Sequence, residues 1–384
     1  MAGLYIHIPF CKTRCIYCDF FSTTQNDRKD AYVKALCREM QLRKDFAGGE
    51  RISTIYIGGG TPSQLTHAQI EYIIYNIYKV YDVEDGCEFT LEANPDDVSE
   101  AFVRFLTREG GQRINRLSMG VQTFDDRRLR FLHRRHTSTQ AADAVRRCQD
   151  KGITNISIDL MHGFPGQTIE EWTKDIDIAL NLSTPHISAY SLMYEEGTKL
   201  TQMLQRGEIE DISEESSADM YRLLRDRLTE HGYQHYEISN FCKPGYHSRH
   251  NSSYWHGIPY IGIGAGAHSY DGNTRSSGIA DIESYMTGIS RGVPDMIIEH
   301  LTDSEKYNEA VMTGLRTSEG ININDIEKKF GTTAREYCIE AATEHIRSGN
   351  LLFNDEEGTL RLSHDGIMIS NVVMSDMMMV EVRG

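Results

Sequence analysis

The stretch YIHIPFCKTRCIYCDFFS, residues 5–22, decides the fold, because it places three cysteines within eight positions directly after a strand-like alternation. These are Cys11, Cys15 and Cys18. Thiolates bind soft metals, and a loop of this length can fold three sulfurs around one face of a single centre. The other cysteines of the chain are scattered singly, which favours a metal site over a disulfide framework.

Two kinds of metal centre compete for this loop. A structural zinc site closes its tetrahedron with a fourth ligand at paired spacing, but no CxxC or HxxxH pair lies nearby, and Cys18 is followed by Asp19 and Phe20. His7 could serve as the fourth ligand, yet it lies within the preceding strand. A four-iron cluster accepts three cysteines and leaves one iron open for a chelating molecule. We therefore predict a [4Fe–4S] cluster, with a zinc-stabilised binding protein as the alternative.

Length, composition and charge bound the class of protein. A chain of 384 residues with 39% hydrophobic content can bury a large core and is expected to form two or three domains. No apolar run approaches the ~18 residues of a membrane span, and the start MAGLYIHIPF lacks the features of a signal peptide, so we predict a cytoplasmic protein. The formal net charge of −16 repels a phosphate backbone, so we predict no nucleic-acid partner.

Strand-like stretches recur along the first half of the chain. They begin near Leu4, Thr54, Glu88, Arg116, Asn155 and Ile187. Between them lie segments with apolar residues at helical spacing, namely 30–46, 66–81, 99–109, 138–152 and 168–182. Successive strands begin 28 to 50 residues apart, close to the roughly 30 or more that a βαβ unit takes. This rhythm predicts an α/β fold with a partial (βα)6 TIM-like barrel, whose functional groups lie at the carboxyl ends of the strands.

We expect three parts along the chain: the barrel over residues 1–232, a connecting region rich in His, Gly and Tyr over 233–298, and a mostly helical domain over 299–384. In the last part, helices precede a hairpin-like stretch at 351–363 and a final helix, an order that resembles a winged helix. Residues 300–384 hold 8 Lys and Arg against 15 Asp and Glu, which disfavours a wing that reads DNA. We expect a structural cover or a partner surface instead.

Glycines and polar residues mark the ends of the predicted strands. The run GGGTP at 58–62 follows the second strand, where missing Cβ atoms let backbone approach a ligand; a tight turn is the alternative. Glu92, Gln122 and Asp159 end otherwise apolar strands, and three such residues facing one mouth favour ligand binding over separate structural roles. The basic run at 127–136 is either a solvated helix face or the source of one arginine that reaches inward to a carboxylate.

CxxxCxxC at the end of the first strand of a (βα) barrel resembles the radical S-adenosylmethionine (SAM) superfamily, over residues 4 to about 195. The resemblance implies that the three cysteines hold a [4Fe–4S] cluster and that SAM chelates its open iron. In that superfamily, reduction of the cluster cleaves SAM and releases a 5′-deoxyadenosyl radical. The run at 58–62 then corresponds to the superfamily's GGE-like segment, whose backbone receives the methionine amino group.

A closer resemblance covers essentially the whole chain. The motifs YIHIPFC, GGGTPS, LEANP, LSMGVQ, IDLMHGFPGQT and GIGAGAHSY are similar to those of oxygen-independent coproporphyrinogen III oxidase and its relatives. Carried over residue by residue, this likeness puts the cluster on Cys11, Cys15 and Cys18, and SAM contacts on Tyr5, Tyr17, Gly59, Gly60, Thr61, Glu92, Gln122, Arg134 and Asp159. Arg134 is then the arginine that reaches inward, and Tyr17 lies near adenine.

Two departures from the oxidase pattern point to a branch of this family. Phe20 stands where the oxidase has a further cysteine, and Cys11 comes almost at once, without the oxidase's N-terminal extension. Both features, with HNSSYW at 250–255, match the heme-chaperone branch of HemW type, in which HNxxYW is a marker. The resemblance implies that His250 is an axial ligand of heme iron, with His247 and His256 as substitutes. The alternative is a hydrogen-bonded histidine in a substrate loop.

This branch implies a heme chaperone with three cofactors, a [4Fe–4S] cluster, SAM and heme. It would deliver heme to apo-hemoproteins, in particular respiratory ones associated with the membrane. The alternative function is oxidative decarboxylation of coproporphyrinogen III in porphyrin biosynthesis. Whether the chain is an enzyme stays open at this point; as an enzyme it would be a coproporphyrinogen III dehydrogenase-type oxidoreductase.

Overall fold

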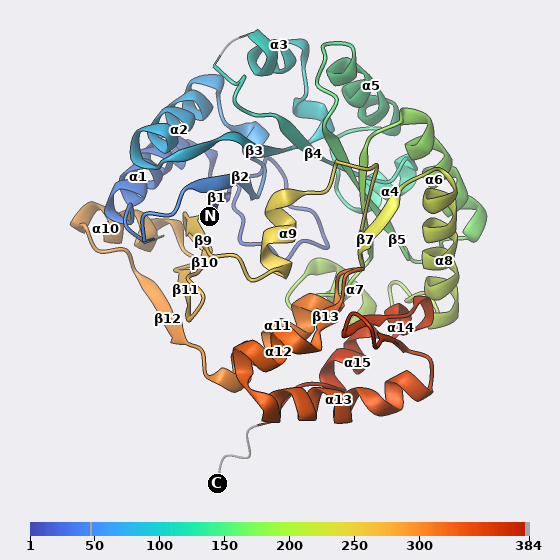
Figure 1. The fold of residues 1–384 in the computed structure, drawn as a ribbon. Helices are drawn as coiled ribbons and strands as arrows, with labels where there is room; N and C mark the ends of the chain where they lie inside the picture. Colours follow the sequence, from blue (N-terminus) through green and yellow to red (C-terminus); the bar gives the residue numbers. More distant parts are fainter. Residues whose placement is uncertain (47, 109, 381–384) are drawn as a thin grey trace.

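The computed structural model describes residues 1–46, 48–108 and 110–380, and one twelve-stranded sheet dominates it (Figure 1). Its strands are β1 (Ala2–Ile8), β2 (Ile52–Gly59), β3 (Val83–Ala93), β4 (Arg116–Gln122), β5 (Ile156–His162), β6 (His186–Ser191), β7 (Gln234–Glu237), β8 (Asn240–Cys242), β9 (Tyr260–Ile263), β10 (His268–Tyr270), β11 (Thr274–Gly278) and β12 (Met296–His300). They lie in the order β12-β11-β10-β9-β1-β2-β3-β4-β5-β6-β8-β7, so β12 and β7 are the edges of an open sheet.

The central six strands, β1 to β6, are parallel neighbours in chain order, which is the predicted arrangement of repeated βα units. The outside of the curved sheet is covered by α1 (Lys29–Leu42), α2 (His67–Val80), α3 (Glu100–Arg108), α5 (Ser138–Gln149), α6 (Ile169–Leu182) and α8 (Glu214–Glu230) (Figure 1). Two short helices, α4 (Asp126–Phe131) and α7 (Lys199–Gln205), pack instead beside the cysteine loop, where Phe131 and Leu200 join a hydrophobic cluster with Ile16. The predicted partial (βα)6 barrel is therefore confirmed as an α/β fold with an open ring.

Local sequence explains where several of these helices begin. α2, α5 and α6 each follow a threonine, Thr66, Thr137 and Thr168, whose hydroxyl accepts a hydrogen bond from the backbone three residues on. The Gln or Glu at that third position returns a bond from its side chain, which completes a capping box. Such boxes satisfy amides that a helix start would otherwise leave unpaired.

Residues 233–298 extend the sheet at both edges. β8 pairs with β6 and β7 with β8, both antiparallel, whereas β9 pairs parallel to β1 and leads into the antiparallel strands β10 to β12. Between the two sets lies α9 (Arg249–Trp255), which Figure 1 shows inside the ring of strands, and α10 (Ile282–Arg291) packs on the outside beside α1. The boundaries of the three predicted parts remain predictions.

The C-terminal part has its own hydrophobic core, around Tyr307, Val311 and Cys338. It contains α11 (Asp303–Leu315), β13 (Ile321–Asn322), α12 (Ile323–Phe330), α13 (Thr332–Arg347), β14 (Leu351–Asn354), β15 (Thr359–Leu362), α14 (His364–Met368) and α15 (Ser370–Asp376). The expected hairpin is β14–β15, joined by β13 into a small sheet, and two short helices stand where one was expected. Among the helices of the described residues, none has the length and apolar character that a membrane crossing requires.

Candidate cofactor site

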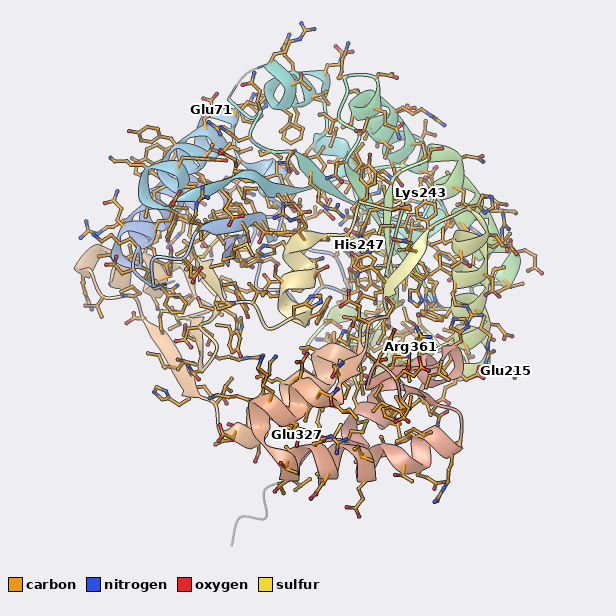
Figure 2. All side chains as sticks on the ribbon, viewed as in Figure 1. Glu71, Glu215, Lys243, His247, Glu327 and Arg361 are labelled. Carbon is orange, nitrogen blue, oxygen red and sulfur yellow. The ribbon has the colours of Figure 1, made fainter. Side chains whose placement is uncertain are left out.

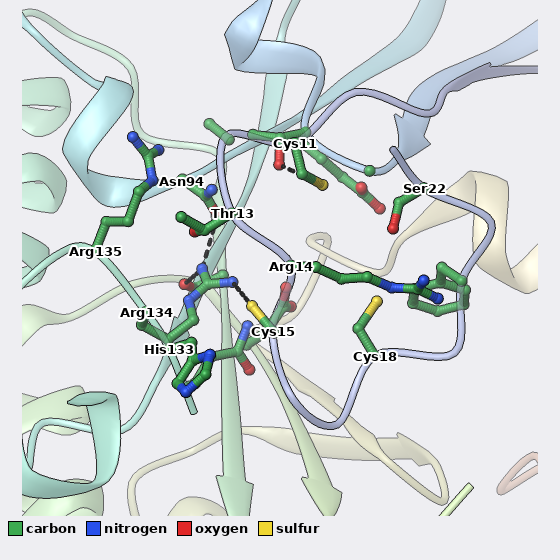
Figure 3. Close-up of a pocket in the computed structure, with 18 of the residues that line it drawn as sticks. Cys11, Thr13, Arg14, Cys15, Cys18, Ser22, Asn94, His133, Arg134 and Arg135 are labelled. Carbon is green, nitrogen blue, oxygen red and sulfur yellow. Dashed lines mark hydrogen bonds between the residues drawn. The ribbon is translucent and has the colours of Figure 1, made fainter. Parts of the chain in front are cut away.

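A cavity of about 160 Å³ opens at the carboxyl ends of the parallel strands, and the three cysteines of residues 11–18 line it (Figure 3). We call it the cofactor cavity. The predicted site residues that line it are Cys11, Cys15, Tyr17, Cys18, Gly59, Gly60, Thr61, Glu92, Gln122, Arg134 and Asp159. Parallel strands bring their carboxyl ends to one edge, which is why residues from five strand ends meet here.

The cysteine loop connects β1 to α1 and is held by hydrogen bonds to Thr23 and Thr61 and by one within the loop. The backbone N–H of Cys11 donates to Thr23 O at 2.8 Å, and that of Cys18 donates to Cys15 O at 3.4 Å. The Thr61 hydroxyl donates to the Cys11 sulfur at 3.4 Å. Burial raises the pKa of the Cys18 thiol to about 11, so a cation must displace its proton on binding. Within the described residues, no three Cys, His, Asp or Glu side chains are arranged to hold a single metal ion.

Two carboxylates line the cavity without a salt-bridge partner among the described residues. Glu92 accepts hydrogen bonds from the Tyr56 hydroxyl at 2.7 Å and the Gly59 N–H at 3.1 Å. Asp159 accepts one from the Ser118 hydroxyl at 3.4 Å. Burial raises the pKa of Glu92 to about 7 and that of Asp159 to about 6. Buried carboxylates of this kind favour a cationic occupant, because a nearby positive charge restores the ionised form.

The glycines at the end of β2 are required by packing against β1. Gly59 has φ +110°, and a Cβ there would lie 2.5 Å from the His7 ring. At Gly60 a Cβ would lie 2.8 Å from the carbonyl carbon of Pro9. The close backbone approach predicted at these glycines is therefore to His7 and Pro9 of the same chain. The Gly59 N–H donates to Glu92.

Gln122 and Arg134 approach the cavity from β4 and from the loop after α4. Gln122 has φ +69° at an irregularity in the β4–β5 register, a strained backbone that re-aims its side chain at the strand end. Arg134 points inward as predicted, but its guanidinium donates to Asn94 Oδ1 at 2.7 Å, Gly120 O at 2.6 Å and the Cys15 sulfur at 3.5 Å. Figure 3 shows these contacts. The carboxylate partner predicted for it is replaced by an amide, a carbonyl and a thiol.

The two tyrosines assigned to SAM differ in position. Tyr17 lines the cavity, as the resemblance implies. Tyr5 does not line it: its hydroxyl lies 3.0 Å from His7 Nδ1, and its ring stacks on Tyr56 at 6.2 Å between centroids. A direct contact of Tyr5 with SAM therefore remains a prediction.

Sequence reasoning missed two residues that shape the cavity. Asn94 holds the Arg134 guanidinium, and Tyr56 holds Glu92. Asn94 follows Glu92 by two positions on the same strand end, so its place on the same face was a usable signal. Tyr56 gave no signal in the sequence, because an aromatic residue in a buried strand is ordinary core composition.

His250 lies at the opposite end of the barrel from the cysteines. It touches residues near the start of β1 and of β2: a Cβ at Gly3 would lie 3.4 Å from His250 Cε1, and Thr54 Oγ1 lies 2.9 Å from His250 Nδ1. Gly59 lies five positions after Thr54 on β2, a rise of about 16 Å. We call this end, where β1 to β6 begin, the amino end; α9 lies there within the ring (Figure 1).

The histidine itself is 1% exposed and has both ring nitrogens occupied, since Nε2 lies 2.8 Å from the Tyr254 hydroxyl. Burial lowers the pKa of His250 to about 3, which keeps it neutral. The substitute ligands are more accessible. His247 is exposed just before α9 (Figure 2), and the exposed His256 lies 3.0 Å from Glu319. The structure thus brings no heme candidate into the cofactor cavity, within the residues it describes.

Comparison with known proteins agrees with both the cavity and the fold. Residues 5–179 match the Radical SAM superfamily, and residues 301–369 match the HemN C-terminal domain. Over 99% of its length the chain is 36% identical to the heme chaperone HemW of Lactococcus lactis, of which it covers 98%. HemW of Bacillus subtilis is also 36% identical, over 97% of this chain and 98% of that protein.

The chain belongs to the HemW family. Its fold is also similar to that of a solved structure, coproporphyrinogen III oxidase (HemN) from Escherichia coli, with a TM-score of 0.83 over 98% of this chain and 89% of that one. The sequence identity to that oxidase is 22%, so this likeness shows the shared fold alone.

The cavity residues fit the cofactors of the radical SAM superfamily, a [4Fe–4S] cluster and SAM. Three thiols on one loop supply the soft ligands that such a cluster takes. SAM carries a sulfonium and an ammonium group, and the two carboxylates Glu92 and Asp159 give the cavity the matching negative charge. The HemW-family cavity therefore has both the sulfur ligands and the charge that these groups require.

Proposed function

We propose that this chain is a heme chaperone, which binds heme, SAM and a [4Fe–4S] cluster and delivers heme to apo-hemoproteins. Full-length identity to proteins named heme chaperone HemW supports this proposal, as do the cofactor cavity and the separate HNSSYW helix. We further propose that it works in the cytoplasm and that its recipients include respiratory hemoproteins associated with the membrane.

The single observation that carries the proposal is the separation of its two motifs. The cysteines lie at the carboxyl end of the barrel and His250 at the amino end; on β2, Thr54 beside His250 and Gly59 in the cofactor cavity are about 16 Å apart along the strand. A SAM-dependent decarboxylase must hold its porphyrinogen substrate beside SAM. A chaperone can instead hold heme away from the cluster, and His250 at the amino end suits that arrangement.

We assign a role to each set of residues in the cofactor cavity. Cys11, Cys15 and Cys18 would hold the cluster, which supplies electron transfer to SAM when both are bound. Glu92 and Asp159 would offset the positive charge of SAM, and Glu92 is itself held by Tyr56 and Gly59. The remaining contacts with SAM would come from Tyr17, Gly60, Thr61, Gln122 and Arg134. Tyr5, whose ring stacks on Tyr56, would act through Tyr56 unless SAM reaches Tyr5 directly.

At the amino end we propose His250 as the axial ligand of heme iron. Imidazole is a common iron ligand, and the surrounding aromatic rings suit packing against a macrocycle. Tyr56 stacks on His250 at 5.2 Å between centroids, and Tyr254 meets it edge-on at 5.1 Å. His247 and His256 are the other candidates on the same segment.

A heme titration tests the proposal. Heme is added to the anaerobically reconstituted protein and to His250→Ala, with His231→Ala, which changes an exposed histidine at the end of α8, as the control. We expect a Soret band typical of histidine ligation in the parent and in His231→Ala, and its loss in His250→Ala. Release of the bound heme to an apo-hemoprotein such as apomyoglobin should follow. A parent that binds no heme would contradict the proposed function.

The alternative, coproporphyrinogen III decarboxylation, uses the same cluster and SAM residues. A turnover assay with coproporphyrinogen III, SAM and a reductant separates the two functions, and we expect no decarboxylated product. The exposed Phe20 at the cavity, where the oxidase pattern has a cysteine, supports this expectation. Turnover without heme binding would favour the enzyme.

A further inference from the structure

A second cavity, of about 190 Å³, lies where the edge of the main sheet meets the C-terminal part. We call it the seam pocket. Its walls come from β7 at the sheet edge, from the end of α11 and the loop that follows, and from β14, β15 and α14. Backbone hydrogen bonds join its two sides: the Ile238 N–H donates to Arg316 O at 3.1 Å, and the Ser318 N–H to Tyr236 O at 3.0 Å. The seam pocket shares no lining residue with the cofactor cavity.

The acidic charge in the seam pocket is already neutralised. Glu237 is the one acidic side chain among the described residues that line the pocket, and it is 2% exposed. Its carboxylate accepts from Arg316 Nη2 at 2.9 Å, from the Ser239 N–H at 3.2 Å and from the side-chain amide of Asn240. The charge of the second lining arginine, Arg361, is therefore left over, in a chain whose formal net charge is −16.

Two donors of this pocket are unused. Arg361 is exposed and has neither a hydrogen bond nor an ion pair with any other described residue. Figure 2 labels it on the side of the C-terminal part that faces the barrel. The Nε of Arg316 is buried and has no hydrogen-bond partner among the described residues. A buried N–H without an acceptor costs free energy that an incoming acceptor recovers.

The rest of the seam pocket is apolar. Leu315 is 1% exposed and Leu362 8%, and the half-buried Ile238 packs with them against the C-terminal core. Leu352 lies opposite Arg361 in the β14–β15 pair, so both side chains leave the small sheet on the same face. Apolar walls with a few polar groups are typical of small-molecule sites. Inorganic phosphate would leave the apolar walls unused, and a neutral hydrocarbon would leave the arginines unpaired.

We propose that the seam pocket binds a small organic carboxylate with an apolar body. Its carboxylate pairs with Arg361 and Arg316, because a planar guanidinium matches the two oxygens of a carboxylate. Its body packs against Leu315, Leu352 and Leu362. Since β7 belongs to the main sheet and Arg361 to the C-terminal part, the bound molecule contacts both and strengthens their docking. This proposal goes beyond heme binding and does not rest on it.

Calorimetry with hexanoate tests the ligand class, on the full chain with its cluster and SAM in place so that the cofactor cavity is filled. Hexanoate should bind the parent. Hexanamide, which has the same body without the charge, and inorganic phosphate, which has charge without the body, should each bind roughly tenfold more weakly or worse.

Three variants test the assignment of the residues. Arg361→Gln should weaken hexanoate binding roughly tenfold. Arg347→Gln is the matched control, since Arg347 is an exposed arginine at the end of α13 and does not line the pocket, and its affinity should equal that of the parent. Leu352→Asn, a change at a residue that is 46% exposed, should weaken hexanoate binding roughly fivefold through the lost apolar contact.

Hydrogen exchange locates the site without a variant. Hexanoate should slow exchange in residues 234–238, 315–318 and 359–367 and leave the cysteine loop unchanged. A parent that does not bind hexanoate, equal binding by Arg361→Gln, or slowed exchange only outside these segments would overturn the proposal. Hexanamide or phosphate binding as tightly as hexanoate would overturn the ligand class. None of these results bears on the heme titration, so the two proposals fail separately.

Discussion

Replacing Glu92 by Gln should stabilise the barrel at alkaline pH while removing SAM binding. Glu92 lines the cofactor cavity with no cation paired to it, and burial raises its pKa from 4.5 to about 7. An acid whose pKa is higher in the folded state contributes stability below its unfolded pKa and loses it as the pH rises through the folded value. The cost of keeping Glu92 ionised at pH 8 is therefore about 3 kcal/mol, since 7 − 4.5 is 2.5 units of roughly 1.36 kcal/mol each.

Most of this cost should be recovered in Glu92→Gln. The amide oxygen still accepts from the Gly59 N–H, and the amide nitrogen takes the place of Oε1, where it can donate to the Tyr56 hydroxyl oxygen. We expect a gain of about 2 to 3 kcal/mol at pH 8 and below about 1 kcal/mol at pH 5. SAM binding should fall strongly, because the carboxylate that offsets its positive charge is gone.

Urea unfolding of the SAM-free protein, followed by tryptophan fluorescence, measures this difference. Of the two tryptophans of the chain, Trp172 in α6 is buried in the main core and reports on the barrel, whereas Trp255 in α9 also contacts Arg316 of the C-terminal part. Glu88→Gln, four residues earlier on β3, is the matched control and should destabilise at pH 8 by roughly 1 to 3 kcal/mol, since one backbone N–H of α9 loses its acceptor. The reasoning is refuted if Glu92→Gln is no more stable than the parent at pH 8, or if its gain is equal at pH 5.

Three further outcomes are expected. Cys15→Ala should lose the iron–sulfur absorption after anaerobic reconstitution, whereas Cys37→Ala, which removes a thiol buried in the main core, should keep it. Gly59→Ala should abolish SAM binding in calorimetry, because its Cβ would lie 2.5 Å from a histidine ring; Gly86→Ala, also at positive φ but with open space around it, should bind SAM normally. SAM affinity should rise from pH 5 to pH 7.5 and then level off, as Glu92 and Asp159, with pKa values of about 7 and about 6, ionise; an affinity independent of pH would contradict this.

Local patterns in the sequence determined the architecture and most of the cofactor cavity. The spacing of Cys11, Cys15 and Cys18 after a strand, and the repeat of strand and helix behind it, predict a partial barrel with its chemistry at the strand ends. Glu92, Gln122 and Asp159 were found in the same way, since each is a polar residue at the end of an apolar strand. These signals are readable because a βα unit is encoded within roughly 30 consecutive residues.

Only the tertiary structure decided which residues meet across those units. It placed His250 at the amino end of the barrel, far from the cysteines, with Thr54 and Tyr254 on its two nitrogens. It also gave Arg134 an amide and a thiol as partners in place of the predicted carboxylate. These contacts join positions up to 196 residues apart, and they depend on the register and curvature of the open sheet. No local spacing records that geometry, because it is set by how all the strands pack together.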